Sequence, residues 1–280
     1  MMWQNKFDTL YFNGCSFTEG GGFEDGKYWL KNAYKEKYNF LYKNEKDVCY
    51  PTIIQKKFPN IKVINEAKSG SGSERIIRKV YEYVLKNGLE KSQKTLFILE
   101  IPSAINRLDI YSNQYNKYLV ANVTYNQKNT IEDTQTTLNW IYGPQLEEEY
   151  RNKTRQLIKE FSKYFVHPIE YEKRVAYEFL GLFSYLEKNN ISFLVEYSRY
   201  FDDNVFIEFN KFFKNFTKEY MFDIEINGKR YNNIVGMGGS EKCLICDEVG
   251  SDISVDGHPG YRAHQLWADG IIDFLNKKYI

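Results

Sequence analysis

Three residues near the two ends of the chain have the types and spacing that nucleophilic catalysis needs. Ser16 lies in NGCSFTEGGG, residues 13–22, where glycines around a polar pair indicate a tight turn. Near the other end, SVDGHPG places Asp256 two residues before His258. In a tight turn such an aspartate can reach Nδ1 of the histidine, which leaves Nε2 to accept a proton from a serine. Together they offer a nucleophile, a base and an orienting carboxylate.

Each residue also has a structural interpretation when it is taken alone. A serine between glycines commonly fills a turn. His258 and Pro259 could simply begin the last helix, and Asp256 could cap it. Cys15 could itself be the nucleophile, or could pack as a small apolar residue. The combination of Ser16 with the Asp-x-His pair favours the catalytic interpretation.

The elements that must position these residues alternate between strand and helix, which predicts a parallel sheet with helices on both faces. Apolar runs predict strands at 7–13, 61–65, 95–101, 191–197 and 220–226. Helical spacing predicts helices at 50–58, 76–85, 168–189 and 204–218, and a last one after Pro259. Ser71 and Glu74 have the spacing of a capping box. The predicted fold class is α/β: a flavodoxin-like three-layer sandwich whose central parallel sheet has about five strands.

Sites in such sheets lie beyond the carboxyl ends of the strands, where NGCSFT and the stretch EAKSGSGS, 66–73, both fall. Two segments do not fit the alternation, residues 20–48 and 103–165, and we expect insertions that form cap segments on one domain of residues 1–280. The second is polar and could hold helices of its own or act as a lid. Its Trp140 and Tyr142 could line a sugar-binding wall, although a solvated cap is the simpler interpretation.

The turn around Ser16 resembles the first sequence block of the SGNH, or GDSL-like, hydrolases. That block reads Gly-Asp-Ser with a nearby Thr, just after the first strand. Here the order is GCSFT, so that Gly14, Ser16 and Thr18 match the block. Cys15 stands where the family has its Asp, and we expect this thiol to pack beneath the turn.

Two further blocks follow in the family's order. Asn65 is followed five residues later by Gly70, after the second predicted strand, and Asp256 and His258 have the family's Asp-x-His form. The resemblance implies Ser16 as nucleophile, His258 as base and Asp256 as orienter. It also implies that the backbone N–H groups of Ser16 and Gly70 would bind the oxyanion, because donors must point where negative charge develops.

The family's remaining block supplies an Asn side chain as a third oxyanion donor after the third strand. Here that strand runs into EIPSAINRLDIY, and Asn106 is the nearest asparagine, a residue or two late. Ser103 or Arg107 could serve instead. The middle of the chain otherwise diverges from the family.

Composition excludes several other classes of function. The formal charge of +1 provides no field for binding nucleic acid. No apolar run is long enough to span a bilayer, and MMWQNKFDTL lacks the apolar core of a signal peptide, so we expect a cytoplasmic protein. Four cysteines in 280 residues do not make a disulfide framework. Cys243 and Cys246 have the spacing of half a zinc site with no second pair, so we expect no metal and no cofactor.

The sequence therefore predicts a serine esterase that works through an acyl-enzyme. From the family resemblance, the substrate class is a small or carbohydrate ester, such as an O-acetyl group on a sugar. Two alternatives stay open: a non-catalytic binding or structural module on the same fold, and an O-acyltransferase. The sequence leaves the acyl length, the natural alcohol and the oligomeric state open.

Overall fold

A computed structural model describes most of the chain. The described residues are 3–20, 49–101, 107–113, 116–125, 136–142, 148–165, 168–197, 220–221, 224–226, 229–231, 234, 259 and 261–279. The predicted helix at 204–218 lies outside these residues, as does most of the segment 20–48.

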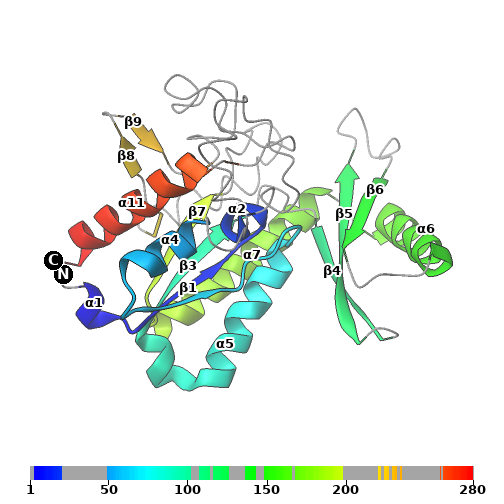
Figure 1. Cartoon of the computed structure of the whole chain (residues 1–280). Helices are drawn as coiled ribbons and strands as arrows, with labels where there is room; N and C mark the ends of the chain where they lie inside the picture. The colour runs from blue at the N-terminus through cyan, green and yellow to red at the C-terminus, as the bar shows by residue number, and fades with distance from the viewer. Residues whose placement is uncertain are drawn as a thin grey trace, which may run out of the picture.

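A parallel sheet of four strands forms the centre of the described structure, in the order β2-β1-β3-β7 (Figure 1). The strands are β2 (Lys62–Asn65), β1 (Thr9–Asn13), β3 (Thr95–Ile101) and β7 (Phe193–Tyr197). Every residue of β1, β3 and β7 is buried, as expected for strands that are covered on both faces. This order is that of a flavodoxin-like sheet, and it reverses direction between β1 and β3.

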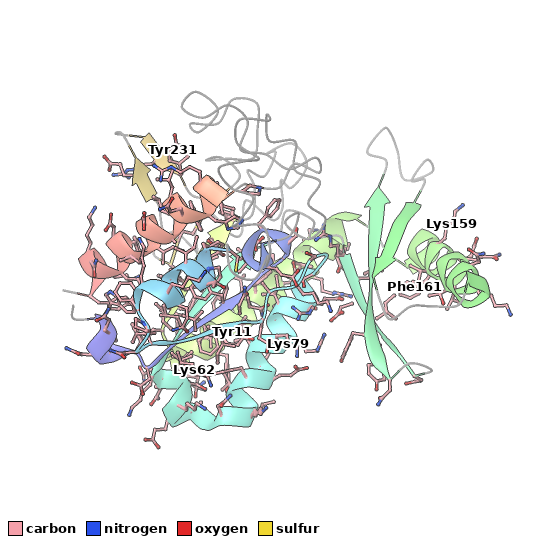
Figure 2. The ribbon with its side chains drawn as sticks, in the orientation of Figure 1. Tyr11, Lys62, Lys79, Lys159, Phe161 and Tyr231 are labelled. Atoms are coloured by element: carbon pink, nitrogen blue, oxygen red, sulfur yellow. The ribbon has the colours of Figure 1, made fainter. Side chains whose placement is uncertain are left out.

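Helices cover both faces, which completes the predicted three-layer sandwich (Figure 1). One face packs against α5 (Ser73–Gln93) and α7 (Pro168–Lys188). The other packs against α1 (Trp3–Lys6), α4 (Tyr50–Lys57) and α11 (Tyr261–Lys278). In Figure 2 the labelled Tyr11 lies on β1, and its hydroxyl donates to the backbone oxygen of Lys79 on α5 at 3.1 Å.

The polar segment between β3 and α7 forms a second sheet, which the sequence did not predict. β4 (Arg107–Ser112), β5 (Lys117–Tyr125) and β6 (Thr136–Tyr142) pair antiparallel, and α6 (Glu148–Phe165) follows them (Figure 1). Arg78 of α5 binds Asp109 of β4 through an ion pair of 2.8 Å, which joins this sheet to the central layers. Figure 2 shows Lys159 and Phe161 on α6, beyond the antiparallel sheet.

Two local predictions are modified by the structure. The segment 220–226 contributes one parallel bridge, between Met221 and Val195 of β7, and its end pairs as β8 (Ile224–Ile226) with β9 (Lys229–Tyr231). The predicted capping box at Ser71 is wrong, because α5 has Gly72 as its N-cap. The Glu74 carboxylate instead accepts the backbone N–H of Asp109 at 2.8 Å, a contact with a distant strand.

Candidate active site

Ser16 lies at the first turn of a short helix on the carboxyl edge of the sheet. β1 ends at Asn13, and α2 (Ser16–Glu19) begins three residues later. We call residues 14–20 the serine turn. It closes at Gly20, whose φ of 89° is a conformation that glycine adopts readily. Ser16 itself is half-buried.

The serine turn lies against the loop that carries Gly70. The backbone N–H of Ser69 donates to the Glu19 carboxylate, and the side chain of Asn65 donates to the backbone oxygen of Thr18 at 3.3 Å. Gly70 is buried and has a φ of 80°, in the left-handed region that favours glycine. The structure thus brings together two of the three segments that the sequence selected.

The candidates for a third oxyanion donor are only partly described. Asn106 and Ser103 lie outside the described residues. The guanidinium of Arg107 donates to the backbone oxygen of Ser71 at 3.1 Å. Arg107 therefore holds the loop that carries Gly70.

Asp256 and His258 also lie outside the described residues, together with Cys243 and Cys246. Pro259 is described and is buried, and α11 begins two residues after it. The placement of α11 consequently determines where the chain emerges from the Asp-x-His segment.

Cys15 is buried, as the sequence analysis expected. Its exposed fraction is 2 %, and its thiol donates to Oε1 of Glu100 at 2.7 Å. Burial and the neighbouring carboxylate raise the pKa of the Cys15 thiol well above its usual value, which disfavours the nucleophilic thiolate. The same sulfur accepts a hydrogen bond from Oγ of Ser16 at 3.9 Å, so the thiol contacts both the serine and Glu100.

A buried carboxyl pair beneath the serine turn is the main feature that sequence reasoning missed. Glu100 of β3 and Glu196 of β7 are register partners on neighbouring strands, with exposed fractions of 1 % and 2 %. Acidic residues are almost never so buried without partners. The only sequence signal was one charged residue inside each of two apolar runs, TLFILEI and ISFLVEY.

Glu100 holds the serine turn from below. Oε2 accepts the backbone N–H of Cys15 at 3.0 Å and the hydroxyl of Thr18, and Oε1 accepts the Cys15 thiol. Gly14 is required here because a Cβ at that position would overlap the Glu100 carboxylate and the Thr18 hydroxyl. The Gly-x-Ser-x-Thr pattern is thus explained by one carboxylate, since the glycine makes room for it and the threonine binds it.

Glu196 connects the same turn to the last helix. Its carboxyl binds the hydroxyl of Tyr50, which lies 2.8 Å from the Thr18 hydroxyl, and it accepts Nε1–H of Trp267 at 2.6 Å. The backbone N–H of Tyr50 donates to Nδ1 of His264, and the two rings stack. His264 of α11 is therefore a buried packing residue.

Burial raises the pKa of both carboxyl groups, because the interior disfavours the charged form. The pKa of Glu196 rises to about 8, from burial first and from the charge of Glu100 second. The pKa of Glu100 is raised by burial against the opposing effect of hydrogen bonds from Cys15 and Thr18.

Within the described residues, no group of three or more acidic, cysteine or histidine side chains could hold a metal ion. None of the described helices is both long and apolar enough to cross a bilayer.

Comparison with protein-family models finds no match, and a search of curated proteins finds none either. Solved structures with a similar fold include a psychrotrophic esterase from Pseudoalteromonas sp. (11 % identity, 96 % of this chain and 99 % of that chain, TM-score 0.44). Another is an acetyl xylan esterase from Butyrivibrio proteoclasticus (15 % identity, 96 % of this chain and 64 % of that chain, TM-score 0.48). A third is a member of the lipolytic protein G-D-S-L family from Veillonella parvula (10 % identity, 95 % of this chain and 96 % of that chain, TM-score 0.43). At these identities and scores the likenesses carry no argument about activity, so the function is inferred from this chain's own residues.

Proposed function

We propose that this chain is a serine esterase in which Ser16 attacks the acyl carbon of an ester. The observation that carries the proposal is the placement of Ser16. It is a half-buried serine at a helix start, at the carboxyl end of β1, where the sheet order reverses direction. Ligands of open α/β sheets bind at such a switch point.

The surroundings of Ser16 support nucleophilic catalysis over a purely structural turn. Ser16 is the first residue of α2, and the family resemblance assigns its backbone N–H to the oxyanion. The adjacent loop provides Gly70, whose lack of a Cβ lets a substrate oxygen approach its N–H. Two such donors can stabilise the oxyanion of a tetrahedral intermediate.

In the proposed reaction His258 removes the proton of Ser16 as the serine attacks, and Asp256 orients the imidazole. The alcohol leaves with the proton from His258, which forms an acyl-enzyme. Water then attacks the acyl carbon with His258 again as base, and releases the acid and free Ser16. Residues 1–280 would form one domain for this chemistry.

The substrate class that we propose is a small or carbohydrate ester, with an O-acetylated sugar as the first candidate. This part rests on the family resemblance of the sequence blocks. An O-acyltransferase would use the same acyl-enzyme and replace water by a sugar hydroxyl. Product analysis with an added acceptor distinguishes the two, because transfer yields an acylated acceptor in place of free acid.

The test is hydrolysis of p-nitrophenyl acetate by the wild type and by Ser16→Ala. We expect the variant to lose at least about 10³-fold in kcat, since members of a triad act as a unit. Ser192→Ala is a matched control, because Ser192 is also half-buried but precedes β7 at the opposite edge of the sheet. A Ser16→Ala variant that folds and is as active as this control would refute Ser16 as the nucleophile. A folded wild type that hydrolyses no ester would favour the non-catalytic module.

A further inference from the structure

Two buried carboxyl groups are joined by an uninterrupted line of oxygen atoms beneath the serine turn. From one end to the other the line runs through the carboxyl of Glu100, the hydroxyl of Thr18, the hydroxyl of Tyr50 and the carboxyl of Glu196. It contains three oxygen–oxygen contacts. All four residues have exposed fractions of 2 % or less, so water does not interrupt the line.

Counting protons shows that the line is incomplete when both carboxyl groups are ionised. The hydroxyl of Thr18 donates to Glu100 and that of Tyr50 donates to Glu196. No hydrogen then remains for the 2.8 Å contact between Thr18 and Tyr50. Two hydroxyl protons cannot fill three contacts, whereas one additional proton on either carboxyl fills all of them.

The other donors indicate which carboxyl carries the negative charge. Glu100 accepts further hydrogen bonds from the backbone N–H and the thiol of Cys15 and from the backbone of Thr18. Glu196 accepts one, from Trp267. Hydrogen bonds to the charged form stabilise it, so the charge belongs on Glu100 and the proton on Glu196. The pKa of Glu196, which is raised to about 8, also favours the proton on Glu196.

Within the part of the chain that the structure describes, the groups that contact the pair come from α4, α11 and the serine turn. Tyr50 comes from α4, Trp267 and His264 come from α11, and Cys15 and Thr18 come from the serine turn. Arg107, at the start of β4, is a nearby cation whose charge opposes the rise of the Cys15 pKa.

We propose that Glu100 and Glu196 hold a single proton between them, and that the line of hydrogen bonds joining them positions the turn that carries Ser16. In this arrangement Glu196 donates to Tyr50, Tyr50 donates to Thr18, and Thr18 donates to Glu100. The line fixes the serine turn relative to α11, which begins just after the Asp-x-His segment. The positioning role rests on the proposed esterase function, but the shared proton does not.

The shared proton makes stability depend on pH in a defined direction. In the unfolded chain Glu196 ionises near its ordinary pKa, about 4.3, whereas in the folded protein it keeps its proton to about pH 8. Between these values the native state binds one more proton than the unfolded state. The equilibrium constant for unfolding therefore rises by about tenfold per pH unit from this pair, and the rise ends above about pH 8.

The first test measures unfolding by urea at intervals from pH 6 to pH 8 in the wild type and in Glu196→Gln. The amide is neutral at every pH, can donate to Tyr50 and can accept from Trp267, so it imitates the protonated carboxyl. We expect the logarithm of the unfolding constant to rise less steeply with pH in the variant, by about one unit per pH unit. Over two pH units this difference amounts to about 100-fold in the unfolding constant. Glu187→Gln, on the exposed end of α7, should keep the wild-type slope. Equal slopes for Glu196→Gln and wild type would overturn the proposal.

The second test compares kcat and KM for Glu196→Gln and Glu100→Gln on one chromogenic ester. Glu100→Gln places an amide N–H₂ against groups that themselves donate hydrogen bonds, so the serine turn loses acceptors. We therefore expect kcat to fall at least about tenfold further in Glu100→Gln than in Glu196→Gln. KM should change less than about twofold. If the shared proton positions the turn, kcat of the wild type should fall above about pH 8, and Glu196→Gln should not show that fall. Equal effects of the two variants on kcat would overturn the positioning role.

The two tests separate this inference from the proposed function. If the wild type hydrolyses no ester, the urea measurement still decides whether the pair shares a proton. If Ser16-dependent hydrolysis is present but the two pH slopes are equal, the function stands and the inference fails.

Discussion

Replacing Cys15 by Asp tests whether Glu100 occupies the space beneath the serine turn. Aspartate is the residue that the SGNH block has at this position, so the change makes the sequence more like the family. In this chain the new carboxyl would lie where the thiol now lies, 2.7 Å from Oε1 of Glu100. We therefore predict that Cys15→Asp destabilises the protein.

The size of the effect follows from the choice between repulsion and protonation. Two unit charges about 2.7 Å apart repel by about 6 kcal/mol at an effective dielectric constant of 20. Holding a proton on a carboxyl of ordinary pKa, about 3.9, costs about 4 kcal/mol at pH 7 and about 1.5 kcal/mol at pH 5. Protonation of one carboxyl costs less than the repulsion. Cys15→Asp should therefore lower the free energy of unfolding by about 4 kcal/mol at pH 7, and most of this loss should disappear at pH 5.

Urea denaturation at the two pH values, followed by circular dichroism, measures both numbers. Cys15→Ala is the control: it removes a donor and a little volume, so we expect a loss of about 1–2 kcal/mol that differs little between pH 5 and pH 7. If Cys15→Asp were as stable as wild type at pH 7, Glu100 could not lie where the structure places it. A loss that is the same at both pH values would indicate a steric effect and refute the electrostatic reasoning.

Three further predictions concern the same region. Gly14→Ala should destabilise by about 1–3 kcal/mol in urea, because its Cβ would approach Cβ of Glu100 to 2.7 Å, and Gly181→Ala, with open space around it, should not. Tyr50→Phe should lower stability by about 1–3 kcal/mol in the same assay, since it leaves buried polar partners unpaired; an unchanged value would show that the line of oxygens contributes nothing. Hydrolysis should rise with pH through an apparent pKa of about 6–7 as the His258 base becomes neutral, and a flat pH–rate profile would contradict a histidine base.

The sandwich was predictable from the sequence because its elements are marked by local patterns. The continuous apolar run at 95–101 became β3, and the helical periodicity after Pro259 became α11. The antiparallel sheet β4–β6 was not predictable, because its polar strands lack a clear alternation. The capping-box pattern at Ser71 failed because Glu74 bonds to a strand that is distant in sequence.

The candidate site was predictable only where its residues are close in sequence. GCSFT marked the serine turn, and the Asn65–Gly70 spacing marked the loop beside it. The pairing of Glu100 with Glu196 depends on the register of β3 and β7, and the contacts of both with Tyr50 depend on helix packing. A single glutamate inside an apolar run gives no sign of such a partner until the sheet order is known.

The central claim is that Ser16, and not its neighbour Cys15, is the nucleophile. Its most direct test is to treat the protein with an alkyl fluorophosphonate and locate the adduct by peptide mass spectrometry, in the wild type, Ser16→Ala and Cys15→Ala. We predict one phosphonyl group on Ser16 in the wild type and in Cys15→Ala, and none in Ser16→Ala, since an activated serine attacks phosphorus as it attacks a carbonyl. An adduct on Cys15, or labelling that persists in Ser16→Ala, would contradict the claim.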